Sequence, residues 1–219
     1  MPRLLQLYCG LATFWGTYFV LSPLFPQSKA KSRPIAKITQ NKVIRNLVQN
    51  CIATSLMIPL ISCVPQIVWF PNSWYGLILK YLSGILMAEI WFYYTHRLLH
   101  NKLFYRWHSD HHAFIQPYAL AGLYCSWLEM ILVNQLSVAI PCQLLGCSQL
   151  EVIIGSIFVS LNVMKGHAGL QLYNNDKIPT WIPDWLISSK THDIHHEKMT
   201  TNYGVLYLLD WIHGTYTSP

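Results

Sequence analysis

The chain has 219 residues, a usual length for one domain, and its composition is that of a membrane protein. Hydrophobic residues make up 53% of the chain and charged residues only 11%, whereas soluble domains carry about 25% charged residues. The net charge of +6 does not indicate a nucleic-acid-binding protein, because the basic residues flank apolar segments and form no stripe with stacking aromatics.

The first two apolar segments, Leu4–Phe25 and Leu47–Phe70, are each long enough to cross a bilayer, which takes about 20 residues of helix. The first segment has no clear small-residue cleavage site, so it is predicted to be a span and not a signal peptide. The loop between the two segments contains no acid, and by the positive-inside rule we expect it in the cytosol. Its basic residues are Lys29, Lys31, Arg33, Lys37, Lys42 and Arg45.

A third apolar segment, Leu77–Tyr94, follows the turn sequence PNSWYG. It has no stop signal before the first histidines, so we expect a long helix that leaves the membrane still helical. The segments Trp127–Leu145 and Leu150–Met164, separated by GCS, predict a membrane hairpin that begins and ends on the same face. In this topology only Arg3 and Lys80, of the 15 basic residues, lie away from the cytosolic side.

These segments predict an all-α integral membrane bundle of about four spans with a cytosolic, histidine-rich helical cap. The spans are the two N-terminal ones, the long helix and the hairpin. We expect a single membrane domain over residues 1–219, with the N-terminal spans and the basic loop in residues 1–75. The six cysteines form no C-x-x-C pair, so neither a disulfide framework nor a thiolate zinc site is indicated.

Eight of the ten histidines fall into three short groups that this topology places on one side of the membrane. Residues at positions i, i+3 and i+4 share one face of a helix, so each group can direct its rings at a common point. The groups are His96 and His100 in HRLLH; His108, His111 and His112 in HSDHH; and His192, His195 and His196 in HDIHH.

Neutral imidazole is a ligand for zinc, copper, iron and nickel. Eight rings are more than a structural zinc site uses, because such a site closes at four ligands. Two metal ions, each with five or six ligands, account better for this number and predict a dinuclear centre. Iron suits the activation of oxygen, although imidazole alone does not exclude zinc or copper.

The order H-x3-H, H-x2-H-H and a distant H-x2-H-H resembles that of the fatty acid hydroxylase superfamily, which includes sterol desaturases, methylsterol monooxygenases and lipid hydroxylases. The resemblance runs from about Trp91 to the C-terminus and is strongest around the histidine groups. The N-Y-G…D…G-T pattern of the tail is similar to the sterol-oxidase and small hydroxylase-domain branch. The resemblance implies a di-iron catalytic region over residues 76–219.

In the family, a further histidine pair at i, i+4 lies between the second and third groups. Here GHAGLQL matches it with His167 but has Gln171 at the second position, which departs from the pattern of many relatives. Gln171 is expected to hold a metal through water or to leave a coordination position open, and it puts full catalytic competence in doubt. His213 matches no ligand position and is interpreted as structural or interfacial. The resemblance thus implies nine ligands: His96, His100, His108, His111, His112, His167, His192, His195 and His196.

Four acids are expected to orient ligand rings by accepting their free N–H groups, and for Glu129 a helix-packing role is the alternative. Asp110, Asp193 and Glu197 adjoin the histidine groups, and for each of them an exposed acid without such a role is an equal alternative. Glu129 lies within an apolar helix, where an acid is costly, and the family has an acid near this point.

The resemblance implies an enzyme that uses O2 and two iron ions to hydroxylate or desaturate a lipid, either a sterol or a fatty-acyl substrate, in lipid biosynthesis at the endoplasmic reticulum. The chain has no flavin or nicotinamide fingerprint, so we expect its electrons to come from elsewhere, and the resemblance implies a b-type cytochrome and its NAD(P)H reductase as the donor. A non-catalytic metal-binding membrane protein is the alternative. A metal transporter is disfavoured, because Glu89 and Glu129 are nearly the only ionisable residues inside the predicted spans.

Overall fold

The computed structural model describes residues 2–24, 38–71, 73–115, 117–168 and 190–218, and in these residues the regular structure is helical throughout. Four helices are long and apolar enough to cross a membrane, over Arg3–Leu24, Gln40–Ile61, Trp74–Leu99 and Gln149–His167. The prediction of an all-α membrane bundle is confirmed. The helices are α1 (Pro2–Leu21), α2 (Gln40–Ile61), α3 (Trp74–Leu99), α4 (Trp127–Glu129), α5 (Leu136–Leu144), α6 (Gln149–Ala168), α8 (Lys190–Lys198) and α9 (Leu208–His213).

Shorter helical turns connect these elements. A π-helical segment, η5 (Met130–Gln135), joins α4 to α5, so residues 127–144 form one helical run. The single 3-10 turns are η1 (Ser22–Leu24), η2 (Tyr105–Trp107), η3 (His111–Ala113) and η4 (Ala119–Leu123).

Polar residues at the helix starts explain where three of these helices begin. The side chains of Thr39, Ser73 and Ser126 accept hydrogen bonds from backbone N–H groups three residues later, at the starts of α2, α3 and α4. These caps satisfy N–H groups that have no partner within the helix.

The second span differs from its predicted bounds of Leu47–Phe70. Helix α2 begins seven residues earlier, at Gln40, because its capped N-terminal turns are polar, and it ends at Ile61. The apolar residues that follow are largely extended, and the N–H groups of Ile67 and Val68 donate to the Leu144 carbonyl. Hydropathy alone does not separate an apolar extended segment from a helix, and for this reason the prediction was wrong here.

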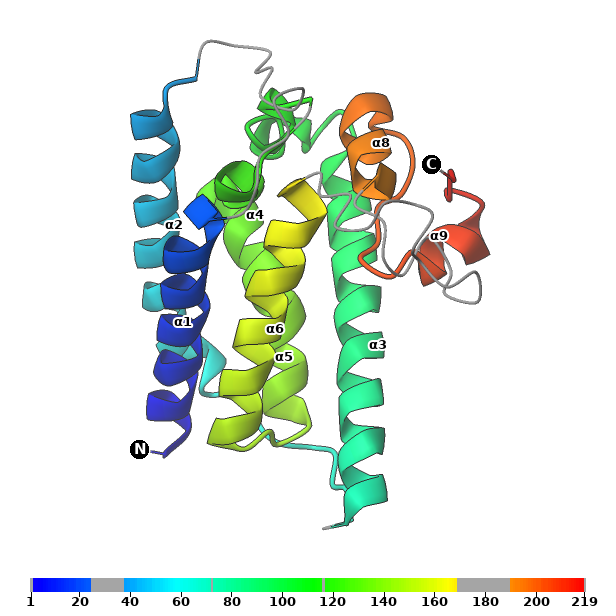
Figure 1. Cartoon of the computed structure of the whole chain (residues 1–219). Helices are drawn as coiled ribbons and strands as arrows, with labels where there is room; N and C mark the ends of the chain where they lie inside the picture. The colour runs from blue at the N-terminus through cyan, green and yellow to red at the C-terminus, as the bar shows by residue number, and fades with distance from the viewer. Residues whose placement is uncertain (1, 25–37, 72, 116, 169–189, 219) are drawn as a thin grey trace.

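The predicted hairpin is present. The run α4–η5–α5 leads away from the histidine end of the bundle, and α6 returns to it (Figure 1). Gly146 closes the turn with a φ of +63°, a left-handed conformation that glycine adopts without strain. The N–H of Cys147 donates to the Cys142 carbonyl at 3.0 Å, which completes a Schellman C-cap.

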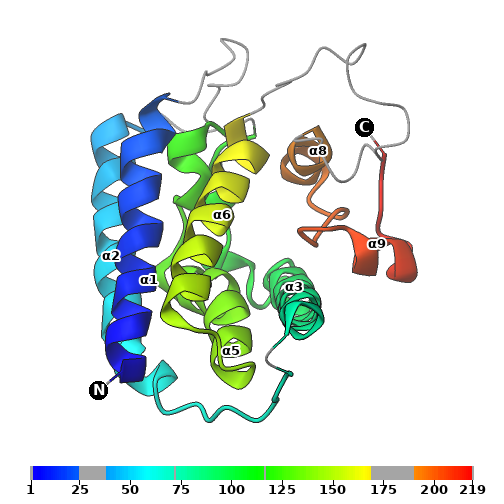
Figure 2. The ribbon, with the colours of Figure 1, turned by 60° about the horizontal axis from the view of Figure 1, so that its bottom comes forward.

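The N-terminal helices form one side of the bundle, with α1 between α2 and α6, while α3 stands on the other side of α5 (Figure 2). They also support the segment that leads to the histidines. The Tyr18 hydroxyl donates to the Ala119 carbonyl at 2.6 Å, and the Asn50 amide donates to the Cys125 carbonyl at 3.0 Å. These bonds hold the buried η4 segment against α1 and α2.

Candidate metal centre

The histidine-bearing elements meet at one end of the bundle, where α3 and α6 end and α8 lies across them (Figure 1). His96 lies in the last turn of α3 and His100 directly follows that helix. His167 lies in the last turn of α6, and His192, His195 and His196 all lie on α8. Elements that are far apart in the sequence therefore bring the rings together.

The second histidine group is not on an α-helix, although its spacing was interpreted as one face of a helix. Helix α3 ends at Leu99, and His108, His111 and His112 lie on and beside the 3-10 turns η2 and η3. His108 and His112 belong to one set of histidines and His111 to the other, and the HDIHH motif on α8 divides in the same way, with His192 and His196 in one set and His195 in the other. The HSDHH motif therefore contributes to two sites instead of one.

The nine histidines form two groups. Within each group, one potential ligand atom per residue lies within 4.8 Å of all the others. The five-histidine group consists of His96, His100, His108, His112 and His195. The four-histidine group consists of His111, His167, His192 and His196.

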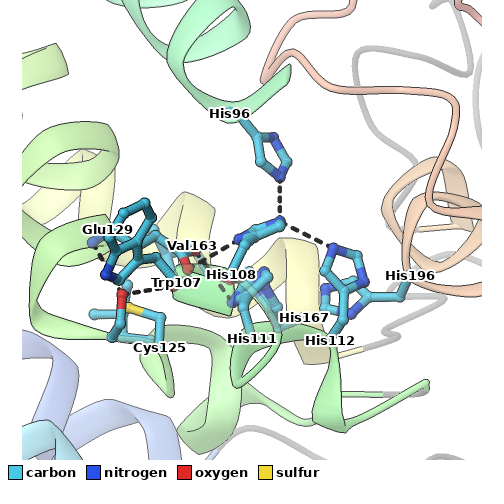
Figure 3. A network of polar contacts seen from close by, with 12 residues as sticks. His96, Trp107, His108, His111, His112, Cys125, Glu129, Val163, His167 and His196 are labelled. Atoms are coloured by element: carbon cyan, nitrogen blue, oxygen red, sulfur yellow. Dashed lines mark hydrogen bonds and ion pairs between the residues drawn. The ribbon is translucent and has the colours of Figure 1, made fainter. Parts of the chain in front are cut away.

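The ring nitrogens approach one another at nearly constant distances. In the five-histidine group, the Nε2 atom of His108 lies 3.1 Å from that of His96, 3.0 Å from that of His100 and 3.0 Å from that of His112. Figure 3 shows the rings of His96 and His112 directed at His108. In the four-histidine group, the Nε2 atom of His192 lies 2.9 Å from that of His167 and 3.1 Å from that of His196.

Backbone carbonyls determine the tautomers of three rings. The Nδ1 atoms of His96, His195 and His167 lie 2.7, 2.7 and 2.8 Å from the carbonyl oxygens of Tyr203, Thr201 and Val163, respectively. Because a carbonyl oxygen only accepts, Nδ1 must carry the proton in each ring. The Nε2 lone pairs of His96 and His195 are then free to coordinate a metal ion in the five-histidine group, and that of His167 is free to do so in the four-histidine group.

Hydrogen bonds among the rings do not account for this convergence. A neutral imidazole nitrogen has either one proton or one lone pair, so His108 Nε2 can form one such bond, whereas three other Nε2 atoms surround it. Nitrogen ligands at about 2.1 Å from a metal and at right angles to each other are about 3.0 Å apart. The observed distances therefore fit a metal ion in each group.

The electrostatic environment keeps the rings neutral. Burial lowers the pKa of His108, His111 and His112 well below the ordinary value, and positive charge on neighbouring histidines would lower it further. The same causes lower the pKa of His192, His195 and His196. At neutral pH each of these rings is therefore uncharged and has one nitrogen lone pair available, as metal coordination requires.

Of the four predicted acids, Glu129 contacts the histidines. One oxygen of its buried carboxylate lies 2.9 Å from His108 Nδ1, and the other lies 3.9 Å from His111 Nδ1. His108 belongs to the five-histidine group and His111 to the four-histidine group, so one carboxylate lies beside both (Figure 3). A carboxylate 2.9 Å from Nδ1 can orient the His108 ring and make its Nε2 atom more basic, whereas His111, at 3.9 Å, lies beyond hydrogen-bond distance.

The other predicted positions differ from Glu129. Asp110 and Glu197 are exposed, and among the described residues no contact joins either carboxylate to a histidine. Asp193 is half-buried on α8. Gln171 and the basic residues Lys29 to Lys37 lie outside the described residues. His213 contacts Tyr94 through Nε2 at 3.0 Å and stacks on Tyr93, away from both groups.

Three features of the centre were not predicted from the sequence. The contacts of the Thr201 and Tyr203 carbonyls with His195 and His96 give no signal in the sequence, because every residue has a backbone carbonyl. At Gly122, a Cβ atom would lie 2.8 Å from the His167 ring, so only glycine permits this approach of η4. Glu89 was noted only as an acid within a span, and its spacing of seven residues from His96 was the available signal that both lie on one face.

Comparisons with known proteins agree with this geometry. The family model described as fatty acid hydroxylase matches residues 81–215. Fatty acid hydroxylase domain-containing protein 2 of Homo sapiens is 27% identical over 196 residues, which cover 85% of this chain and 55% of that protein. Sphingolipid C4-hydroxylase SUR2 of Saccharomyces cerevisiae is 31% identical over 155 residues, which cover 68% of this chain and 43% of that protein.

A third relative, very-long-chain aldehyde decarbonylase GL1-9 of Oryza sativa subsp. indica, is 33% identical over 128 residues, covering 57% of this chain and 47% of that protein. The chain spans about half the length of the curated relatives it matches. No solved structure is significantly similar to it. The match of the family model over more than half of the chain, with all nine clustered histidines inside it, shows that this integral membrane protein belongs to the fatty acid hydroxylase family.

Proposed function

We propose that the protein is a membrane monooxygenase that uses two iron ions and O2 to hydroxylate a lipid. The observation that carries this proposal is the division of nine buried or half-buried histidines into two adjacent groups with metal-ligand spacing. Names of relatives add support, since several are lipid hydroxylases. Two bound iron ions would supply the reduction of O2 and the oxidation of an unactivated C–H bond.

The residues of this chain would hold and orient the metals. The five-histidine group would provide five nitrogen ligands to one ion, and the four-histidine group four to the other. Glu129 lies beside a ring of each group and would hold the tautomer of His108. An ion held by the four-histidine group would have room for a further ligand. From the resemblance, Gln171 or water is expected to fill that position.

The substrate is proposed to be a lipid that reaches the centre from the bilayer. The helices α3 and α6, which carry His96 and His167 at their ends, expose apolar side chains along candidate membrane spans. The similarity to sphingolipid and fatty acid hydroxylases favours a sphingoid or fatty-acyl chain over the sterol suggested by the tail motif. Hydroxylation consumes O2, two electrons and two protons for each alcohol and water formed. Desaturation of the lipid to an alkene is the alternative reaction.

We further propose that the histidine end faces the cytosol at the endoplasmic reticulum and takes electrons from a b-type cytochrome and its NAD(P)H reductase. Basic residues at this end, such as Lys42, Arg45, Lys102 and Arg106, suit both the positive-inside rule and an acidic donor.

The test is metal analysis of the purified protein combined with lipid profiling of cells that do or do not express it. We expect about two irons per chain, consistent with two ligand groups, and a hydroxylated lipid that appears only with the wild-type protein. His195→Ala should abolish the product while membrane insertion remains normal. One zinc ion per chain with no new lipid would instead support the non-catalytic metal-binding alternative.

A further inference from the structure

An acid inside a membrane span holds the C-terminal tail. Glu89 lies on α3, is only 2% exposed, and its Oε2 atom accepts hydrogen bonds from the N–H groups of Val205 and Leu206 at 2.9 Å each. An ionisable group in this position is costly unless it has such partners. The acid therefore has a specific task in the fold.

Asp210 receives the two preceding N–H groups of the same segment. Its Oδ1 atom accepts from Tyr203 N–H at 2.8 Å, and its Oδ2 atom accepts from Gly204 N–H at 2.7 Å. Asp210 itself is fully buried and also accepts from the Thr215 hydroxyl at 2.6 Å. Two carboxylates thus receive four consecutive N–H groups, and we name Glu89, Asp210 and residues 203–206 the tail clip.

The tail clip is adjacent to the ligands of one metal site. Tyr203, whose N–H donates to Asp210, accepts the Nδ1 proton of His96 through its carbonyl at 2.7 Å. Two residues earlier, the Thr201 carbonyl accepts the Nδ1 proton of His195 at 2.7 Å. His96 and His195 both belong to the five-histidine group.

His192 and His196 of the four-histidine group share α8 with His195, but the other two members, His111 and His167, are held by other parts of the chain. His167 donates its Nδ1 proton to the Val163 carbonyl of its own helix, and His111 lies beside Glu129. A disturbance of the tail clip should therefore reach one group and leave the other in place.

Gly204 provides an independent check on how tightly the clip is packed. A Cβ atom at this position would lie 2.3 Å from Glu89 Oε1 and 3.0 Å from Asp210 Oδ2. The Glu89 carboxylate therefore approaches the backbone so closely that a Cβ atom would have to displace it, and the Asp210 carboxylate is in tight contact.

We infer that Glu89 is a positioning residue, which acts through the tail clip to hold His96 and His195 of the five-histidine group in their ligating tautomer and orientation. This inference rests on the proposed two-metal function for its metal readout. Orienting contacts behind metal ligands typically change metal affinity by roughly 10- to 100-fold.

The experiment uses the full chain in lipid nanodiscs, with Glu89→Leu, Glu89→Gln and Gly204→Ala. The first readout is hydrogen exchange of the amides of residues 203–206 in the metal-free protein. We expect exchange to rise roughly tenfold or more at residues 205 and 206 in Glu89→Leu, because these N–H groups lose their acceptor, and in Gly204→Ala, because the new Cβ atom displaces the Glu89 carboxylate. Glu89→Gln keeps a carbonyl oxygen that can accept both N–H groups, so it should retain most of the protection.

The second readout is the Mössbauer spectrum of the 57Fe-loaded protein. In Glu89→Leu and Gly204→Ala we expect the signal of one iron to weaken or shift while the other persists, with rescue in Glu89→Gln. Gly155→Ala, where a Cβ meets nothing within 4 Å, and Glu151→Gln, whose acid pairs with Lys80 at the opposite end, are the matched controls.

Unchanged exchange at residues 203–206 in Glu89→Leu would overturn the inference. Equal loss of both iron signals would also overturn it, because it would indicate a general structural role. If Glu89→Leu does not fold, Gly204→Ala decides by the same criteria. If the wild type binds no iron, the proposed function fails, and the exchange readout still decides whether the clip exists.

Discussion

At the scale of single residues, the centre depends on which nitrogen of each ring carries the proton. Three backbone carbonyls and one carboxylate lie at the Nδ1 atoms of four histidines and leave Nε2 for the metals. Buried imidazoles with convergent lone pairs are unfavourable without a cation. The arrangement therefore lowers the stability of the metal-free protein, and metal binding restores that stability.

Glu129 allows the link between the two groups to be tested. In Glu129→Gln, the amide has one acceptor oxygen, which can face only one of the two rings. Its NH2 group would face the Nδ1 proton of the other ring, His108 or His111. We expect metal affinity at both groups to fall by roughly 10- to 100-fold, measured by competition with a chelator. Glu197→Gln, which changes an exposed acid on α8, is the control and should bind metal as the wild type does. Wild-type affinity in Glu129→Gln would exclude the orienting role.

At the scale of elements, the helix ends and the connecting turns position the ligands. The run of residues 127–144 begins with the cap of Ser126, whose hydroxyl accepts from Glu129 N–H and also donates to the Trp107 carbonyl. One residue thus joins the start of the helix that carries Glu129 to the turn that precedes His108.

Ser126→Ala removes both bonds of this cap. We expect the loss to destabilise the protein by about 1 kcal/mol, the usual value for an N-cap, or somewhat more because of the second bond. The measurement is unfolding in a denaturing detergent. Ser109→Ala, at an exposed position beside His108, should change stability little. A Ser126→Ala protein as stable as the wild type would contradict this account of the cap.

Gly122 tests how η4 packs on α6. In Gly122→Ala the new Cβ atom would lie 2.8 Å from Cγ and Nδ1 of His167 and would displace the ring. We expect the four-histidine group to lose metal while the five-histidine group keeps it, seen as about half of the wild-type metal content with elemental analysis. Gly16→Ala on α1, where a Cβ meets nothing within 4 Å, is the matched control. Full occupancy in Gly122→Ala would show that the ring can move without loss of ligation.

At the scale of the whole molecule, both metal groups lie at one end of the bundle, and the opposite end carries the turns after α2 and α5 (Figure 1). Of the basic residues in the described part of the chain, only Arg3 and Lys80 lie toward that opposite end. This asymmetry predicts the orientation of the protein in the membrane.

Cysteine labelling in sealed microsomes tests this orientation. Cys63 is exposed at the end opposite the histidines, and Ser109→Cys places a thiol at the histidine end. We expect a membrane-impermeant maleimide to label Ser109→Cys directly and Cys63 only after the membrane is permeabilised. The reverse pattern would place the histidine end in the lumen and would exclude a cytosolic electron donor.

Much of the fold and of the ligand set was predictable from the sequence, because the signals are local. Apolar segments of about 20 residues predict spans wherever they lie. The His192, His195 and His196 spacing predicted a helical face, and α8 confirms the helix. The end of the second span at Ile61 was missed because hydropathy stays high over residues 64–70, although Pro65 was a local signal of the helix end. The N–H groups of Ile67 and Val68 donate to Leu144, which is distant in the sequence.

The sequence by itself determined that this is a helical membrane protein with histidines at metal-ligand spacing, since hydropathy and residue spacing act over a few turns of chain. Only the tertiary structure decided that His111 separates from His108 and His112, and that Glu129 lies between them. It also decided that the tail supplies carbonyls to His96 and His195. These features depend on contacts between different elements, of which that between His96 and Tyr203 joins residues 107 apart, and their free energy comes from burying polar groups with the correct partners.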